Sequence, residues 1–244
     1  MSLKAGLRYA FLASLVCAMG CDNETDDTDD TDDTDVTDET VTLAGTIVDA
    51  MLDTPIEGAE VCLEDPADFD CETTDAEGYA SVSGLPTEHD VLVTVTATGY
   101  PDIIGAGRME MDDITIPRFG IPSDGAIDLL ETASGIDVEA TKAQLMFTVT
   151  DASGTGIEGV AATLSTGGTA YYLDAGGLFA AAATETSTKG AGGFPNVATG
   201  DADLTLTHAT LTCAAALAWE ANNDGTFSVP LEADAVTMVS YVCE

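Results

Sequence analysis

Residues 45–63 read GTIVDAMLDTPIEGAEVCL, and this stretch decides which fold we expect. Apolar residues recur among polar ones through Val41–Val48, and the same pattern returns at Ala59–Leu63 after a turn at Pro55–Gly58. Alternation with a period of two indicates a strand with one buried face, and Pro and Gly mark the turn between strands. The stretch therefore predicts two consecutive β-strands.

Further strands follow on the carboxyl side. A turn at Asp75–Gly78 leads into Tyr79–Val82, and Val91–Thr96 is rich in β-branched residues, which favour sheets. Short strands separated by turns at regular intervals are typical of a β-sandwich.

Three runs together resemble the carboxypeptidase regulatory-like domain, a transthyretin-like β-sandwich. They are the stretch quoted above, TTDAEGYASVSGLP at residues 73–86 and VLVTVTATGYPD at residues 91–102. The resemblance covers about residues 41–117, and it implies framework turns at Gly58, Gly78 and Gly99-Tyr100. It implies a fold and no catalysis, because no peptidase metal-binding signature surrounds the two histidines of the chain.

The second half of the chain repeats the opening pattern. Phe147–Asp151 followed by Gly156–Ala161 parallels Gly45–Asp49 followed by Pro55–Glu60. The parallel continues more loosely, with Thr188–Phe194 standing for the turn and strand at Asp75–Tyr79, and Ala202–Thr207 for the strand at Val91–Thr96. Asn222–Gly225 predicts a hairpin turn, and Val236–Val242 predicts the closing strand.

One helix is predicted between the halves. Gly125–Ser134 places Ile127, Leu130 and Ala133 on one side, and Gly135 follows as a stop. A helical linker that packs on one sandwich is the simplest interpretation.

The predicted fold is all-β, with two tandem Ig/transthyretin-like β-sandwiches, one short linking helix and a disordered acidic N-terminal spacer. The predicted domains are a signal peptide at 1–20, a lipidated cysteine and spacer at 21–40, a carboxypeptidase regulatory-like sandwich at 41–117, a linker at 118–142 and a second sandwich at 143–244.

The amino terminus has the layout of a secretory signal. Lys4 and Arg8 precede an apolar run, and the segment Ala18-Met19-Gly20-Cys21 resembles a lipobox, although that motif usually has Leu where Ala18 stands. This resemblance implies cleavage before Cys21 and acylation of that residue, which would anchor the protein in a membrane. The alternative is an ordinary signal-peptidase cut after Gly20.

Residues 22–40 read DNETDDTDDTDDTDVTDET. Such dense like charges resist compaction, so we expect a disordered, extended spacer. An EF-hand is excluded because its loop requires a Gly, which this segment lacks. Weak divalent-cation binding and O-linked glycans on the threonines remain open.

The formal net charge of −38 falls near −40 if Lys4 and Arg8 are removed. By sign, this charge disfavours nucleic acid as a partner.

Four cysteines remain for pairing after removal of the signal and acylation of Cys21, namely Cys62, Cys71, Cys213 and Cys243. An even number in an exported chain favours disulfides, and three pairings are possible in principle. We favour Cys62–Cys71 and Cys213–Cys243, because each pair stays within one predicted domain. Metal ligation is disfavoured, since the chain has no CxxC motif.

No catalytic residues and no cofactor are predicted. His89 is expected in a turn and His208 at a strand end, and neither has a nucleophile pattern nearby. We therefore expect a non-catalytic cell-envelope lipoprotein, at the outer membrane or cell surface, that presents its sandwiches to a protein or glycan. Tyr171, Tyr172 or Trp219 would serve a glycan by stacking if exposed, although such residues are more often core. The alternatives are a structural lipoprotein with a spacing role and cation binding by the spacer.

Overall fold

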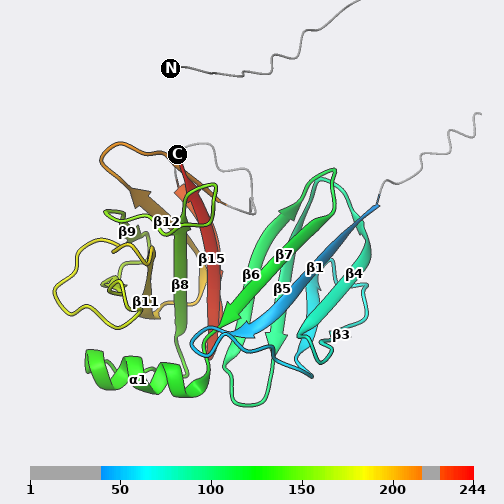
Figure 1. Ribbon diagram of the computed structural model, residues 1–244, viewed down its shortest axis with the longest axis horizontal. Helices are drawn as coiled ribbons and strands as arrows, with labels where there is room; N and C mark the ends of the chain where they lie inside the picture. The colour runs from blue at the N-terminus through cyan, green and yellow to red at the C-terminus, as the bar shows by residue number, and fades with distance from the viewer. Residues whose placement is uncertain (1–39, 216–225) are drawn as a thin grey trace, which may run out of the picture. The chain divides into compact units, whose positions relative to one another are not determined.

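The computed structural model describes residues 40–215 and 226–244, which belong to one compact unit, Asp38–Glu244. The strands of the first half are β1 (Thr40–Asp49), β2 (Glu60–Asp65), β3 (Glu72–Thr73), β4 (Tyr79–Pro86), β5 (His89–Thr96), β6 (Asp102–Met109) and β7 (Ile114–Ile121). The helix α1 (Asp124–Ser134) follows. The strands of the second half are β8 (Ala143–Thr150), β9 (Ala161–Leu164), β10 (Tyr171–Tyr172), β11 (Ala191–Val197), β12 (Gly200–Thr207), β13 (Cys213–Ala215), β14 (Thr226–Leu231) and β15 (Ala235–Cys243). The predicted all-β class with one short helix is confirmed in the described residues (Figure 1).

Each half contains the same arrangement of six strands. In the first half, β1 pairs antiparallel with β4 and parallel with β7, while β5 pairs with β2 and β6. In the second half, β8 pairs antiparallel with β11 and parallel with β15, while β12 pairs with β9 and β14. The sequence repeat is therefore a structural repeat.

The repeat extends to a buried threonine in each half. Thr74 accepts the N–H of Ala59 through its hydroxyl oxygen at 2.8 Å and donates to the carbonyl of Ile56 at 2.7 Å. Thr186 makes the same two bonds with Val160 and Ile157, at 3.0 and 2.7 Å. Both hydroxyls thus satisfy the backbone of the turn that enters the second strand of each repeat.

The two halves share one sheet. Its strand order is β10-β11-β8-β15-β6-β5-β2-β3, with β13 paired to β15, and the halves meet where β15 lies parallel to β6. In Figure 1, β15 (red) lies beside β8 in this sheet. Two three-stranded sheets, β4-β1-β7 and β14-β12-β9, complete the fold.

The two small sheets cover opposite faces of the shared sheet. On β15, Val236 packs with the core of the first half, whereas Tyr241 packs with the core of the second. Thr237, which alternates with Val236, is fully buried and donates to the carbonyl of Pro230 on β14 at 2.6 Å. Because neighbouring strand residues point to opposite faces, β15 contributes one face to each core.

The predicted domain boundaries remain predictions, but two structural facts bear on them. The strand β7 continues past residue 117 to Ile121, and β15 is hydrogen-bonded to both halves.

The linking helix α1 ends where the sequence indicates. Gly135 has a φ of 70°, and its N–H donates to the carbonyl of Glu131, which closes the helix in the left-handed conformation. Ile127 and Leu130 are half-buried, as predicted, but Ala133 is exposed. Glu131 and Ser134 take part in the packed side instead.

Both favoured disulfides are present, Cys62–Cys71 and Cys213–Cys243. Cys213 and Cys243 are also directly opposed in the pairing of β13 with β15. The predicted signal, Cys21, the spacer and the hairpin turn at Asn222–Gly225 lie outside the described residues.

Candidate functional site

A large hollow in the described residues lies where β6 and β15 separate. These two strands pair only from Asp102–Gly105 with Ala235–Met238. Beyond that point β6 stays with β5, and β15 stays with β8. A cavity of about 350 Å³ occupies the fork and reaches between the two sheets of the first sandwich.

The lining of this fork cavity is largely apolar. It includes inward-facing side chains from β1, β5, β7, β14 and β15, among them Leu43, Val93, Ile116, Phe119, Phe227 and Met238. Such clefts of a few hundred Å³ with apolar walls are the usual form of a small-molecule site.

Small residues on β6 leave the space open. Gly105 and Gly107 line the cavity, with Ala106 between them. Because glycine has no side chain, β6 projects nothing into the cavity at these two positions. A Cβ built on Gly105 would meet Phe119 at 3.9 Å and the carbonyl of Val93 at 4.0 Å, which are ordinary contact distances. The position can therefore hold a side chain, and the sequence leaves it empty.

Two of the few cationic residues line the same cavity, and both are paired. The Arg108 guanidinium donates to Asp90 at 2.9 Å and lies 3.8 Å from Glu110. The hydrogen bond that Arg108 donates to Asp90 is the main reason that the pKa of Arg108 is raised. Arg118 forms an ion pair with Asp53. The arginines are thus neutralised by their neighbours.

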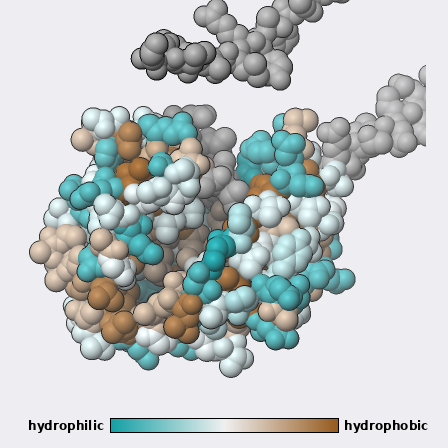
Figure 2. All heavy atoms as spheres, in the orientation of Figure 1, coloured by the Kyte–Doolittle hydropathy of each residue, from teal (hydrophilic) through white to brown (hydrophobic). Residues whose placement is uncertain are grey.

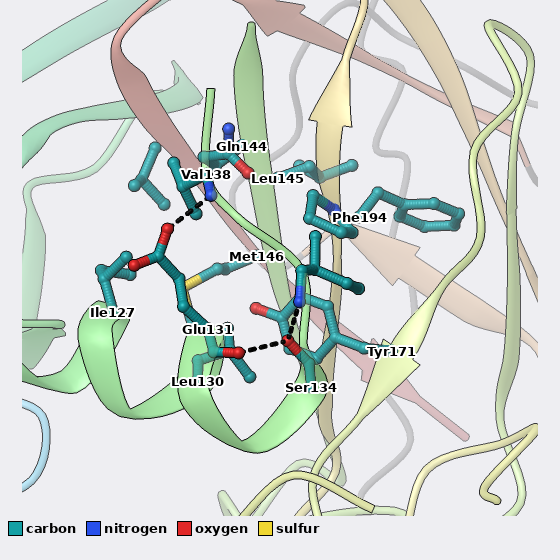
Figure 3. A pocket seen from close by; sticks show the side chains of 13 residues that line it. Ile127, Leu130, Glu131, Ser134, Val138, Gln144, Leu145, Met146, Tyr171 and Phe194 are labelled. Carbon is teal, nitrogen blue, oxygen red and sulfur yellow. Dashed lines mark hydrogen bonds between the residues drawn. The ribbon is translucent and has the colours of Figure 1, made fainter. Parts of the chain in front are cut away.

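A second, much smaller pocket lies under α1 (Figure 3). Ile127 and Leu130 of the helix face Met146 and Tyr171, and the space between them is about 20 Å³. The carboxylate of Glu131 accepts the N–H of Val138 and so holds the chain that leaves the helix. A space of this size holds about one water molecule, so we interpret it as helix packing.

A buried carboxylate lies at the end of β1. Asp49 is 2% exposed, and its Oδ1 accepts the N–H groups of Met51 at 2.8 Å and Leu52 at 2.7 Å. Its Oδ2 accepts the hydroxyl of Tyr100 at 3.0 Å. Burial raises the pKa of Asp49, but the hydrogen bonds, including one with Ser123, outweigh it and lower the pKa overall. Burial, together with Asp49, raises the pKa of Tyr100. These contacts brace a loop and show no group placed for proton transfer to a ligand.

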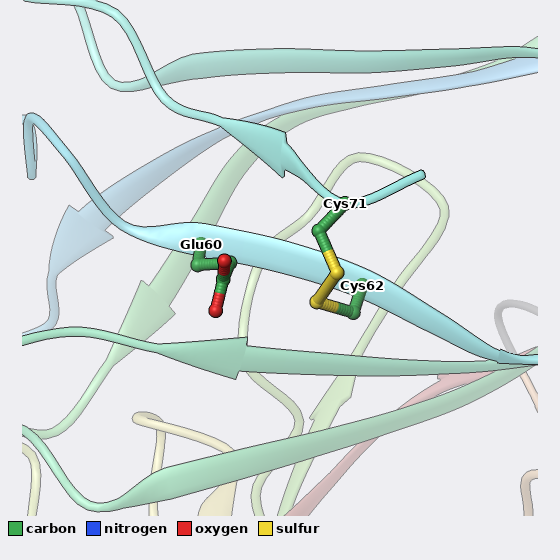
Figure 4. A group of neighbouring side chains, drawn as sticks. All are labelled: Glu60, Cys62 and Cys71. Atoms are coloured by element: carbon green, nitrogen blue, oxygen red, sulfur yellow. A yellow bond between two sulfur atoms is a disulfide. The ribbon is translucent and has the colours of Figure 1, made fainter. Parts of the chain in front are cut away.

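One trio of metal-ligand side chains occurs in the described part of the chain, Glu60, Cys62 and Cys71 (Figure 4). The two sulfur atoms are bonded to each other, so neither is a thiolate that could bind a metal ion. The trio is a disulfide with a carboxylate beside it.

The two histidines have local structural contacts. His89 begins β5 rather than lying in a turn, and its Nε2 is 3.4 Å from Asp65. His208 follows β12, as predicted for a strand end, and its Nδ1 accepts the N–H of Leu211 at 3.0 Å. The hydrogen bonds that these two rings make in the described residues are to the Asp65 carboxylate and to the N–H groups of Thr210 and Leu211.

The tyrosines considered for glycan stacking are in the core. Tyr171 is 6% exposed and Tyr172 is 3% exposed, and the Tyr172 hydroxyl accepts the N–H of Ala162 at 3.0 Å. Burial raises the pKa of both phenols. Stacking on an external sugar by these two residues is therefore ruled out, and Trp219 lies outside the described residues.

Apolar residues reach the face shown in Figure 2 only in small, separate groups among hydrophilic ones. None of the helices in the described ranges is long and apolar enough to cross a membrane.

The sequence predicted the disulfide cysteines but not the fork cavity. Its lining comes from strands of both repeats, and the one local signal is the close spacing of Gly105 and Gly107 in an apolar stretch. That signal alone does not distinguish a hollow from a bend or bulge.

No protein-family model matches the chain, and no curated protein matches it. The resemblance to the carboxypeptidase regulatory-like domain therefore stays a prediction.

Among solved structures, the chain is similar to the TIE protein of Bacillus anthracis, with a TM-score of 0.31 and 13% identity over 84% of this chain. It spans 34% of that protein. It is also similar to the shaft pilin SpaA from Lactobacillus rhamnosus GG, with a TM-score of 0.26 and 12% identity over 84% of this chain and 98% of that one. It is similar as well to the minor pilin GBS52 of Streptococcus agalactiae, with a TM-score of 0.27 and 13% identity over 83% of this chain and 95% of that one. TM-scores this low establish neither a shared fold nor a shared function.

Proposed function

We propose that this chain is a non-catalytic protein of the cell envelope that is anchored through Cys21 and presents its two sandwiches, as one stiff unit, to a protein ligand. The observation that carries the proposal is the shared sheet, in which β15 is hydrogen-bonded to β6 and to β8. Two modules joined by a linker alone would move independently, whereas a continuous sheet fixes their loops relative to each other. Fixed loops lower the entropic cost of binding a large partner.

A protein is favoured over a glycan as the ligand. Of the three aromatic residues considered for stacking on a sugar, Tyr171 and Tyr172 are buried, and Trp219 lies outside the described residues. Pull-down from envelope extracts with the purified full chain should recover a partner, and a glycan array probed with the same protein should give no signal. Binding on the array without protein capture would contradict this choice.

The anchor is tested separately by metabolic labelling with palmitate. Cys21→Ser should abolish labelling, because acylation takes place on the thiol of that residue. Cys17→Ser is the matched control, since Cys17 lies in the predicted signal and should not affect labelling. Undiminished labelling of the Cys21 variant would refute lipidation at this position.

A spacing role is the second candidate, and the same stiff unit favours it. If residues 22–40 hold the sandwiches away from the membrane, their deletion should remove function in cells while the purified variant still binds its partner. Surface protease accessibility on intact cells then shows whether the sandwiches face outward. No functional change on deletion argues against the spacing role.

A further inference from the structure

The fork cavity is large, and it opens to solvent at its rim, where Thr115, Arg118 and Ser240 are exposed. Protein interiors are packed to the density of organic crystals, and their voids are few and small. At about 350 Å³, this cavity falls in the size range of ligand pockets, roughly 300–1,000 Å³. It corresponds to the volume of roughly a dozen water molecules, at about 30 Å³ each.

The chemistry of the walls restricts what can occupy it. Most of the wall is apolar, as at Val93, Phe119 and Met238, so a largely polar molecule would replace few of its bonds to water. Besides the two arginines, the polar side chains in the described lining are Ser81, Thr115, Ser228, Ser240 and Tyr241. An apolar molecule loses no such bonds, and it also gains by leaving water.

Charge restricts the occupant further. The charged residues in the described lining are Arg108 and Arg118, and each is already paired, with Asp90 and with Asp53. Asp90 and Glu110 lie beside Arg108 and Asp53 beside Arg118, so this part of the cavity carries no excess positive charge to attract a carboxylate, and the net charge of −38 opposes its approach. An entering ammonium would find no free carboxylate in this lining.

We propose that the fork cavity binds an uncharged hydrocarbon chain, such as that of a long-chain alcohol. The chain lies between the sheets of the first sandwich, over Gly105 and Gly107 of β6. This site is separate from the surface role proposed above, because its described lining consists of strand residues whereas that role rests on the loops.

The binding test uses three probes with the same chain and different heads: 1-decanol, decanoate and decylammonium. Decanol should raise the melting temperature of the full-length protein in proportion to the logarithm of its concentration, as expected for a ligand of the native state. Calorimetric titration should give decanol an affinity at least about tenfold above that of either ion, since burying an unpaired charge is costly. Equal or tighter binding of decanoate would overturn the proposed selectivity, and no binding of decanol would overturn the site.

A cavity-filling variant locates the binding. Gly105→Leu should reduce decanol affinity by about tenfold or more, because its side chain takes the place of the ligand. Gly105→Ala is the matched control: it makes the same backbone change, its Cβ fits at ordinary contact distances, and most of the cavity stays open. Unchanged binding by a folded Gly105→Leu protein would refute the location.

A second measurement covers the case in which Gly105→Leu does not fold. A photoreactive diazirine analogue of decanol, irradiated with the unmodified protein, should label peptides of β6, β7 or β15, and excess decanol should suppress the labelling. Labelling that falls on other segments, or that decanol does not suppress, would refute the site without any variant.

Discussion

Gly78 and Gly58 both adopt the left-handed backbone, with φ of 76° and 77°, yet their surroundings differ. A Cβ on Gly78 would lie 2.5 Å from the carbonyl oxygen of Ile47, whereas a Cβ on Gly58 would meet nothing within 4 Å. Gly58 is therefore favoured by its backbone conformation alone, whereas Gly78 is favoured by its conformation and by the lack of space for a side chain.

This pair separates backbone strain from collision. Gly58→Ala should lower the free energy of unfolding by about 1–2 kcal/mol, the cost of placing a side chain in the left-handed region. Gly78→Ala should cost clearly more, because Ile47 must also move and its strand is paired on both sides. Urea denaturation of the two variants checks this, and equal losses would show that the predicted collision is absent.

Asp49 predicts a pH dependence of stability. Because hydrogen bonds lower its pKa in the folded state, Asp49 stabilises the fold above the pKa of an unfolded Asp, about 3.9. This contribution is lost as the pH falls through the folded-state pKa. The stability gap between the wild type and Asp49→Asn should be full near pH 6 and should shrink below about pH 4.

The control for Asp49 is Asp112→Asn, which changes an exposed carboxylate in the same half. Its stability should follow that of the wild type at each pH. A gap for Asp49→Asn that stays constant from pH 6 to pH 3 would contradict the role of its charge.

At the scale of elements, the two disulfides should contribute unequally. Cys213–Cys243 closes a loop of 30 residues and holds β13 to β15, whereas Cys62–Cys71 closes a loop of 9. In the chain-entropy treatment these loops are worth roughly 3–4 and 2–3 kcal/mol.

Replacement of both cysteines of a pair by Ala should follow this order. The 213/243 variant should lose more stability in urea, also because Cys243 is 2% exposed and packs in the second core. The 62/71 variant is its natural comparison, since Cys71 is exposed. The reverse order would show that loop length does not dominate here.

The strands that could be predicted from the sequence are those with high local strand propensity or with clear turn residues beside them. The β-branched run of β5 and the turn at Asp75–Gly78 depend on local chemistry, and both lie where the sequence placed them. The strands β6 and β7 gave no such signal. Gly105 and Gly107 have low strand propensity, and Pro117 lacks the N–H of a strand interior, so only pairing with neighbours makes these segments extended.

At the scale of the whole molecule, the sequence predicted two repeats but not the sheet that they share. The same limit hid the fork cavity, whose existence depends on where β6 and β15 separate. The apolar residues of each strand predict only that the strand is buried. Nothing in the local pattern of Val236 or Met238 shows that β6 lies beside them. Parallel pairing between distant segments is set by tertiary packing.

Because the two halves share one sheet, we expect them to unfold together. Leu85 is fully buried in the first half, and Leu85→Ala should lower stability by about 2–5 kcal/mol. Because β15 is paired across the junction, amide hydrogens of β8 and β12 in the second half should also exchange faster. Native-state hydrogen exchange measures this.

Leu204→Ala, in the core of the second half, is the reciprocal variant, and it should speed exchange in β1 and β5. The exposed Leu129→Ala should change neither half. Faster exchange confined to the mutated half in both core variants would show that the halves unfold separately.

The pairing of β1 also has a mechanical consequence for a protein tethered ahead of it. β1 begins at Thr40 and lies between β4 and β7, with hydrogen bonds that run across the strand direction. Tension on the amino-terminal side pulls along β1 and loads both of its ladders in shear, so many bonds must break together. Single-molecule pulling from this end should give a higher rupture force than pulling that peels an edge strand such as β9. If the proposed anchor at Cys21 holds the chain at a cell surface, the molecule would keep its shape while that surface is under drag.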